Sequence, residues 1–190
     1  AIDLSGDFRI NDADIFKDFY KLEHPGDLQT AFVYGLAETN REAIRSAQYI
    51  ANPGCFATAT LLALSPMVKS GLLTGNMVVD AKTGSSGSGA KAAANTHHPQ
   101  RMNSFYAYKP FTHQHVPEIE QHLKSISASV SDLVFMTHSL PVSRGIFASC
   151  YLQTTVEVTN EDLTNLFKSF YSEAFFVRIV TGSPDINWVK

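Results

Sequence analysis

The sequence predicts an α+β fold in which a mixed or antiparallel β-sheet is covered by helices. Two stretches rich in β-forming residues, 133–138 and 146–158, are joined through a segment that contains Pro141 and Gly145, which favours an antiparallel pair. Strand–helix–strand order, with the helices expected on one face, argues against a doubly wound parallel sheet. The chain has 190 residues and 44% apolar content, which is enough for the core of one large domain.

The first fifty residues have an α/β pattern. Extended segments are expected at 1–5, 32–36 and 48–51. Asn11 is the expected N-cap of a helix that runs to about Leu22. Thr39 is expected to cap a second helix over about 40–47, with Glu42 as its capping-box partner.

The Pro-Gly pair at 53–54 marks a turn, and a helix is predicted to begin at Cys55 and to run to about Val68. Gly71 is its expected C-cap. A thiol in the first turn of a helix faces unpaired backbone N–H groups and the positive end of the helix dipole, which favours the thiolate. The alternative is that Cys55 is a small buried apolar residue, which is the commoner fate of cysteine.

Beyond this helix, residues 76–82 are a predicted strand that leads into a loop of small residues at 83–91. The backbone N–H groups of such a loop are able to approach an anionic ligand closely, although its composition is equally typical of a flexible surface loop. Residues 95–110 lack periodicity and are expected to form a long ordered excursion. Long loops of this kind in compact domains are often functional.

One helix is predicted before the strand pair and one after it, and a last strand follows. Pro117 and Glu118 suit the first turn of a helix that is entered at about 112–120. Thr159 is expected to cap a helix that runs to about Ala174. A last strand is predicted at 175–180.

The composition excludes several classes of function. The formal charge is −3 and no run of lysine or arginine occurs, so neither a nucleic-acid partner nor an anionic membrane is expected. Two cysteines do not make a disulfide framework, which favours a reducing compartment. No apolar run approaches the roughly 18 residues of a membrane span, and no signal peptide opens the sequence. A cytoplasmic protein is therefore expected.

The histidines suggest catalysis rather than metal binding. His113 and His115 alternate, but no His-Glu-x-x-His or Cys-x-x-Cys motif is present, so no metal site is expected. A Cys55–His115 pair is the simpler interpretation, because a sulfur nucleophile and a histidine proton carrier form a unit for covalent catalysis. His24 and His122 are expected at the surface.

Several motifs then occur in an order that resembles a known family. They are residues 3–9, 33–38, 52–58, 83–89, 113–118 and 141–145. Together they are similar to the N-acetyl-gamma-glutamyl-phosphate reductase family of the semialdehyde dehydrogenase superfamily. One departure is Ala37, where the family usually has proline; this affects a turn more than the chemistry.

The resemblance implies a domain organisation. Residues 1–50 would be the C-terminal remnant of an NADP-binding Rossmann domain, and residues 51–190 would be a glyceraldehyde-3-phosphate-dehydrogenase-like catalytic and dimerisation domain without its last segment. The glycine-rich pyrophosphate turn does not occur in this chain. The intact enzyme is expected to use NADP(H) and to form a homodimer or homotetramer, whereas this portion alone is expected to be inactive.

The resemblance also implies the chemistry. Cys55 would attack the acyl phosphate to give a thioester, which NADPH reduces to the semialdehyde in arginine biosynthesis. His115 is the expected acid/base group, with His113 as second choice and Glu118 as an orienting residue. The expected substrate-binding residues are Arg9, Arg144, Asn52 and Thr58. The expected nicotinamide-side residues are Ser86, Gly87 and Gly89.

Other interpretations remain at this point. Arg9 and Arg144 also suit surface salt bridges. A reductase for a related N-acyl-glutamyl or aminoadipyl phosphate shares every motif above. A Cys–His hydrolase would also use a cysteine at a helix start and a later histidine. Finally, the chain could be a non-catalytic dimerisation domain.

Overall fold

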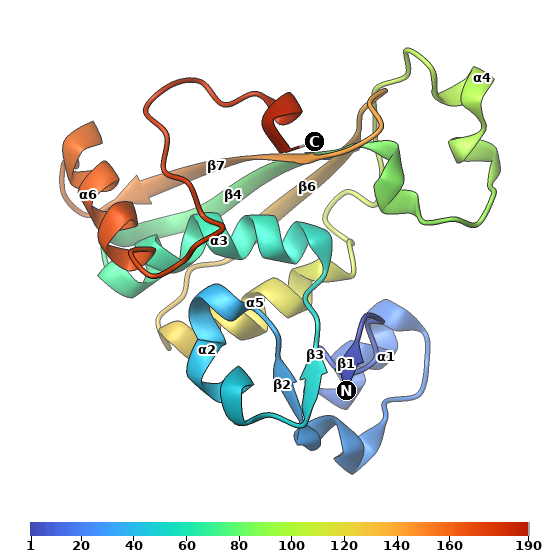
Figure 1. The fold of residues 1–190 in the computed structure, drawn as a ribbon, viewed down its shortest axis with the longest axis horizontal. Coiled ribbons are helices and arrows are strands. Elements are labelled where there is room, and N and C mark those ends of the chain that lie inside the picture. The colour runs from blue at the N-terminus through green and yellow to red at the C-terminus, as the bar shows by residue number, and fades with distance from the viewer. Residues whose placement is uncertain (190) are drawn as a thin grey trace.

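The computed structural model describes residues 1–189 and contains two β-sheets with helices around them (Figure 1). The small sheet contains β1 (Ile2–Asp3), β2 (Phe32–Tyr34) and β3 (Tyr49–Ala51). The large sheet contains β4 (Leu73–Thr83), β5 (Tyr106–Ala107), β6 (Leu133–Ser139) and β7 (Ile146–Thr154). The α-helices are α1 (Ala13–Tyr20), α2 (Ala37–Ser46), α3 (Cys55–Ser70), α4 (His98–Arg101), α5 (His115–Ile126) and α6 (Asn160–Phe170). The predicted α+β class is confirmed.

The large sheet is mixed, and its strand order is β5-β6-β4-β7. β6 runs parallel to β4, whereas β5 and β7 are antiparallel to their neighbours. The predicted direct pairing of 133–138 with 146–158 is therefore wrong, because β4 lies between the two strands and β7 ends at Thr154. The connection between them passes the end of β4, where the backbone N–H of Gly84 donates to the carbonyl of Gly145.

The small sheet is parallel throughout, in the order β1-β3-β2. Its strands end beside the turn that precedes α3, since the backbone N–H of Asn52 donates to the carbonyl of Asp3. Parallel strands at this point agree with a remnant of a doubly wound domain. The domain division near residue 50 stays a prediction.

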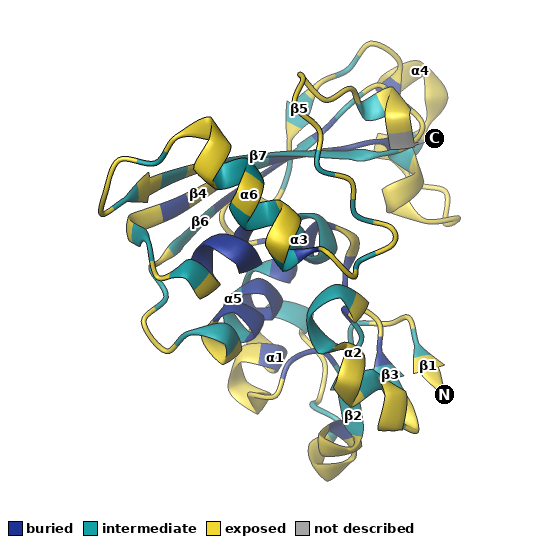
Figure 2. Cartoon of the chain, turned by 60° about the vertical axis from the view of Figure 1, so that its left-hand side comes forward, coloured by how far each residue is buried: buried dark blue, intermediate teal, exposed yellow. Residues whose placement is uncertain are grey.

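The hydrophobic core lies between the large sheet and the two helices α3 and α5, which cover one face of it (Figures 1 and 2). Along β4, Met77, Val79 and Ala81 are buried against the helices, while Val78 points to the opposite face. Two-residue alternation of this kind is expected of a strand with one covered face. Phe56, from the first turn of α3, is buried in the same core.

The helix α3 begins at Cys55 as predicted and runs to Ser70, two residues beyond the predicted end, and Gly71 is its C-cap as predicted, with a positive φ of 70°. Pro66 lies inside this helix, where proline has no N–H for the carbonyl four residues earlier. The hydroxyl of Tyr171 donates to that carbonyl, which belongs to Leu62, at 2.7 Å. The chain after α6 is thereby tied to α3, and the missing helical hydrogen bond is replaced.

Other predicted boundaries shift. Asp12, rather than Asn11, caps α1, because its carboxylate accepts the N–H groups of Asp14 and Ile15. α2 begins at Ala37 instead of residue 40. Thr39 therefore lies inside the first turn and does not cap the helix.

Towards the C-terminus the prediction is partly right. Thr159 caps α6 as predicted, with Asp162 as its capping-box partner, but the helix ends at Phe170 rather than Ala174. The strand predicted over 175–180 is wrong, because that segment pairs with no other strand and Phe175 and Phe176 are exposed. None of the helices within residues 1–189 is long and apolar enough to cross a membrane.

Candidate active site

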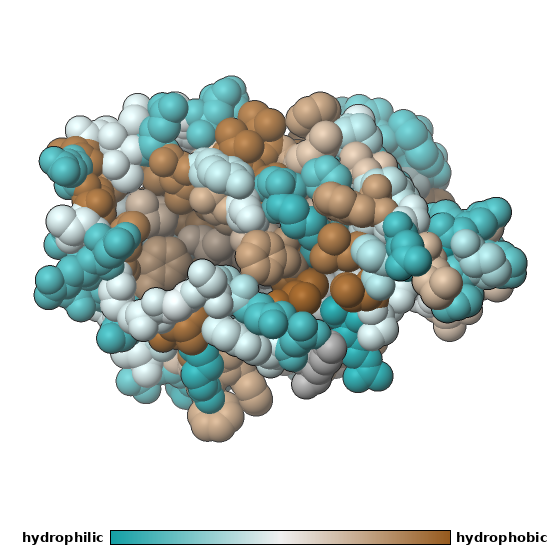
Figure 3. All heavy atoms as spheres, turned by 90° about the horizontal axis from the view of Figure 1, so that it is seen from above, coloured by the Kyte–Doolittle hydropathy of each residue, from teal (hydrophilic) through white to brown (hydrophobic). Residues whose placement is uncertain are grey.

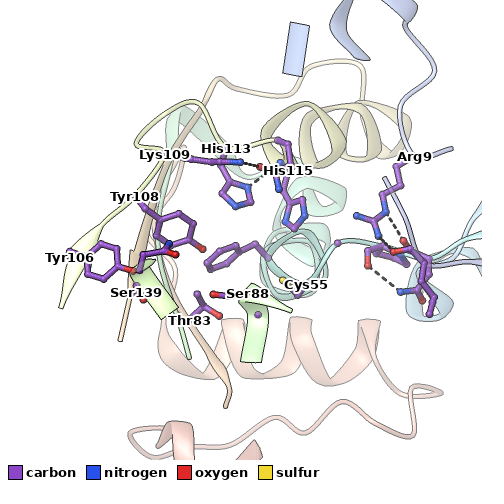
Figure 4. Close-up of a pocket in the computed structure, with 18 of the residues that line it drawn as sticks. Arg9, Cys55, Thr83, Ser88, Tyr106, Tyr108, Lys109, His113, His115 and Ser139 are labelled. Carbon is purple, nitrogen blue, oxygen red and sulfur yellow. Dashed lines mark hydrogen bonds between the residues drawn. The ribbon is translucent and has the colours of Figure 1, made fainter. Parts of the chain in front are cut away.

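A cavity of about 390 Å³ lies where the two sheets and the starts of α3 and α5 meet (Figure 4). Its wall is completed by the segment before β5 and the turn after it. The lining residues used below are Arg9, Asn52, Gly54, Cys55, Arg101, Tyr106, Tyr108, Lys109, His113, His115 and Ser139. Cys55 is exposed to this cavity, so its interpretation as a buried apolar residue is wrong.

Glu118 fixes the turn that presents Cys55. Its carboxylate is fully buried, and Oε1 accepts the Gly54 backbone N–H at 2.8 Å and the Tyr34 hydroxyl at 2.8 Å. The Arg9 Nη1 lies 3.8 Å from Oε2. Burial raises the pKa of Glu118, and Arg9 with the two donors opposes this shift. Burial likewise raises the pKa of Tyr34, which keeps its hydroxyl protonated and able to donate.

This arrangement differs from the predicted role of Glu118. Neither carboxylate oxygen is hydrogen-bonded to His115, whose buried Nδ1 has no partner among the described residues. Glu118 therefore positions the start of α3 and the Arg9 guanidinium, and it does not orient the histidine.

Arg9 is part of the same framework. It is 8% exposed, and its Nε donates to the carbonyl of Asn52 at 2.7 Å while Nη2 donates to the carbonyl of Leu4 at 3.0 Å. The surface salt-bridge interpretation of Arg9 is wrong. The guanidinium reaches the cavity with each of its nitrogens already facing a protein oxygen.

The imidazole of His115 lies directly against the backbone of Gly54. A Cβ added at Gly54 would be 2.2 Å from Nε2 of His115, so only glycine permits this approach beside the cysteine. Figure 4 shows His115 and Cys55 facing the same cavity. The ring of His113 lies next to that of His115, with centroids 4.6 Å apart.

Both histidines are neutral near pH 7. Burial, assisted by nearby cations, lowers the pKa of His113 to about 4 and that of His115 to about 3. The backbone N–H of His115 donates to Nδ1 of His113 at 3.2 Å, so neutral His113 has its proton on Nε2. Within residues 1–189, no group of three or more potential metal ligands includes these rings.

The structure corrects the prediction that Cys55 rests as a thiolate. Desolvation raises the pKa of the Cys55 thiol, and the backbone N–H groups of Phe56 and Cys55, followed by Arg9, only partly oppose the rise. The helix start therefore acts as predicted, but the surrounding protein outweighs it. A neutral thiol thus faces a neutral imidazole, and its proton must move when the sulfur reacts.

The depressed histidine pKa values predict acid sensitivity. The unfolded chain has the ordinary histidine pKa of 6.5, so it binds more protons than the native chain at lower pH. The stability present above pH 6.5 is then lost as the pH falls towards the folded values. From pH 7 to pH 5 the two histidines should together cost about 4 kcal/mol.

Urea unfolding at both pH values tests this prediction. The double variant His113→Gln/His115→Gln should lose about 4 kcal/mol less than the wild type over the same pH interval. An identical pH dependence in the two proteins would show that these rings do not resist protonation in the native state.

Some of the remaining predicted site residues line a cavity beside Cys55, and others do not. Asn52 lines the main cavity. Ser86 and Gly87 line a second cavity of about 350 Å³ that also reaches Cys55. Gly89, Thr58 and Arg144 line neither of the two cavities. The Thr58 hydroxyl instead donates to the carbonyl of Gly54 within α3.

Some features were not predicted from the sequence. Arg101, Tyr106, Tyr108, Lys109 and Ser139 line the main cavity. Most of them come from the aperiodic stretch 95–110. The length of this stretch was the one feature of the sequence that suggested a functional role for it.

The prediction that His24 and His122 lie at the surface is wrong. His122 is 6% exposed, and its Nε2 lies 3.0 Å from the Thr39 hydroxyl. His24 is half-buried, and its ring contacts the carbonyl of Ile10.

Comparison with known proteins places this arrangement in a family. Residues 55–190 match the family described as semialdehyde dehydrogenase, dimerisation domain. The chain belongs to this family. The match begins at Cys55, so the whole of α3 and the large sheet lie within the semialdehyde dehydrogenase dimerisation domain.

Curated relatives support the resemblance found in the motifs. The chain is 45% identical over 182 residues to the N-acetyl-gamma-glutamyl-phosphate reductase of Geobacillus sp. (strain WCH70), covering 94% of this chain and 52% of that protein. It is 39% identical over 192 residues to the enzyme of the same name from Methanocaldococcus jannaschii, covering 100% of this chain and 55% of that protein. The chain thus spans about half the length of the curated relatives it matches.

Solved structures confirm the fold. The aspartate semialdehyde dehydrogenase II of Vibrio cholerae, complexed with ASA, has a TM-score of 0.63 at 16% identity, over 96% of this chain and 55% of that one. Another structure of the Vibrio cholerae enzyme has a TM-score of 0.60 at 18% identity, over 88% of this chain and 52% of that one. At such identities the similarity concerns the fold alone.

Proposed function

We propose that this chain is the catalytic portion of an N-acetyl-γ-glutamyl-phosphate reductase, an oxidoreductase of arginine biosynthesis located in the cytoplasm. The observation that most favours this function is the placement of Cys55 at the start of α3, in a cavity with the His115 ring packed on the preceding glycine. The relatives named above, with 39% and 45% identity over nearly all of this chain, support the substrate.

In this mechanism Cys55 acts as the nucleophile. Its sulfur attacks the carbonyl carbon of the acyl phosphate while Nε2 of His115 accepts the thiol proton. The bond between that carbon and the phosphate oxygen breaks, and a thioester remains on the sulfur. In this mechanism the proton moves during the attack, because the resting thiol and imidazole are both neutral.

The same histidine serves the second half of the reaction. NADPH, when bound, supplies the hydride that reduces the thioester. The His115 imidazolium then donates its proton to the oxygen of the resulting thiohemiacetal. The carbon–sulfur bond then breaks while His115 takes the hydroxyl proton and passes it to the departing sulfur, which releases the semialdehyde and returns Cys55 to its thiol form.

The second cavity suits the reactive end of a nicotinamide cofactor. It reaches Cys55, and its lining of Ser86, Gly87, Gly145 and Ile146 is small and neutral, with one apolar surface for a flat ring. Gly89 lies outside this lining, so we assign Ser86 and Gly87 to the cofactor side. The remainder of the dinucleotide would need the nucleotide-binding domain that the proposed division near residue 50 assigns to a longer protein.

We also assign the uncovered face of the large sheet to self-association in a homodimer or homotetramer. The family description includes dimerisation. Val78 is 36% exposed and Tyr151 is 61% exposed on the face opposite α3 and α5. Figure 3 looks onto the molecule from that side, and apolar side chains gather there around a hollow.

The assay that tests the proposed function follows NADPH oxidation with N-acetyl-γ-glutamyl phosphate, using the complete protein that contains this chain. The His115→Asn variant should lose about 10²–10⁴ in kcat, because it removes the proton carrier beside Cys55. His113→Asn is the matched control and should lose less, since its Nδ1 is occupied by the backbone N–H of His115.

Two outcomes would contradict these assignments. Wild-type protein that leaves NADPH unoxidised with this substrate would refute the function. A larger loss for His113→Asn than for His115→Asn would reverse the two histidine roles.

A further inference from the structure

Arg101 is a buried cation in the wall of the main cavity. Its side chain is 8% exposed, and Nη2 donates to the carbonyl of Leu140 at 3.0 Å. Its Nε is buried and has no hydrogen-bond partner within residues 1–189. No carboxylate among residues 1–189 forms a salt bridge with it. A guanidinium removed from water without a counter-charge is costly, so this position is suited to receive an anion.

Arg9 provides the contrast within the same cavity. Its Nε and Nη2 donate to backbone carbonyls, and its Nη1 faces the buried carboxylate of Glu118. The charge of Arg9 is thus offset by the protein. The charge of Arg101 is not, and Arg101 is therefore the stronger candidate for holding an anionic group of a ligand.

The two arginines lie at opposite ends of the cavity. Arg101 is bonded to Leu140, the residue after Ser139, and Figure 4 shows Ser139 on the opposite side of Cys55 from Arg9. Burial raises the pKa of the Tyr108 hydroxyl, the charge of Cys55 raises it further, and the charge of Arg101 lowers it, so this hydroxyl lies within electrostatic range of both residues. A ligand whose reacting carbon is at Cys55 would therefore extend towards Arg101.

We propose that Arg101 binds the α-carboxylate of the substrate, while Cys55 holds its reacting carbonyl carbon. This inference rests on the proposed function, whose substrate has an acyl phosphate at one end and a carboxylate at the other. The phosphate leaves after the first step, whereas the carboxylate stays with the covalently bound chain. A fixed guanidinium at the far end would hold that chain during both steps, because it binds a carboxylate in a two-pronged manner.

The reverse reaction tests the proposal in the complete protein, because the two anions then belong to separate substrates. Arg101→Gln should raise the KM for N-acetylglutamate semialdehyde by about 10- to 100-fold, which is the loss of one charge-assisted hydrogen-bonded pair. The KM for inorganic phosphate should stay unchanged. Arg45→Gln, which alters an exposed arginine on α2, is the matched control and should change neither constant.

The α-methyl ester of the semialdehyde supplies a second measurement, which needs no variant. The wild type should show a KM for the ester about 10- to 100-fold above that for the acid, and Arg101→Gln should treat the two alike. An unchanged semialdehyde KM in the variant, a rise confined to the phosphate KM, or equal wild-type KM values for acid and ester would each overturn the proposal. A wild type that fails to convert the acid would refute the proposed function instead.

Discussion

Cys55→Ser is expected to lower kcat for N-acetyl-γ-glutamyl phosphate reduction by about 10⁴- to 10⁶-fold, as removal of a catalytic nucleophile does elsewhere. A serine hydroxyl ionises far less readily than a thiol, and its oxygen ester is a poorer hydride acceptor than a thioester. The fold should be unaffected, because the Cys55 side chain is exposed to the cavity. Steady-state NADPH oxidation measures the loss, and thermal unfolding checks the fold.

The second cysteine is the control for this variant. Cys150 lies on β7, and burial raises the pKa of its thiol to about 11, so it is a poor nucleophile. Cys150→Ala should therefore retain the wild-type kcat within a few-fold. A Cys55→Ser protein that kept more than about 1% of the wild-type rate would be incompatible with covalent catalysis at this position.

Glu118→Ala is expected to lower the free energy of unfolding by about 3–5 kcal/mol. The substitution leaves the buried Arg9 guanidinium without its carboxylate, and it removes the acceptor for the Gly54 N–H and the Tyr34 hydroxyl. Urea unfolding measures the change. Glu118→Gln should be milder, because an amide oxygen still accepts these hydrogen bonds although it cannot offset the charge.

Glu42→Ala is the matched control for this stability prediction. Glu42 also pairs with an arginine, Arg45, but both side chains are exposed, so removal should cost no more than about 1 kcal/mol. Equal losses for Glu118→Ala and Glu42→Ala would mean that the buried carboxylate does not hold the start of α3.

Local signals explain what the sequence predicted well. The position of α3 could be predicted from a Pro-Gly turn, a run of alanine and leucine with no proline before Pro66, and the glycine at Gly71. Each of these signals acts through backbone geometry at its own position. The capping box at Thr159 was predicted for the same reason. Cys55, His113 and His115 were identified as a group because a cysteine at a helix start and a pair of alternating histidines supply a nucleophile and a proton carrier.

Features that depend on partners distant in sequence were missed. The alternation in β4 and β6 indicates strands but does not state which strand lies beside which, so β4 was not placed between β6 and β7. The aromatic residues at 175 and 176 suggested a strand, yet a strand needs a pairing edge, and none is used there.

The effects of burial and charge at the site could not be predicted from the sequence either. The helix start at Cys55 was evident, but the opposing desolvation arises from the cavity walls. Glu118 was recognised as functional, although its true partners, Gly54, Tyr34 and Arg9, lie far away in the chain. Apart from the length of its segment, nothing in the sequence pointed to Arg101, because an isolated arginine in an aperiodic segment does not reveal its burial.

The covalent step is tested most directly by mass spectrometry of the complete protein after incubation with N-acetyl-γ-glutamyl phosphate in the absence of NADPH. An acyl group attached to the peptide that contains Cys55, and released by hydroxylamine as a thioester is, is the predicted result. An acyl group on another residue, or no adduct on protein that turns over when NADPH is added, would contradict a mechanism through Cys55.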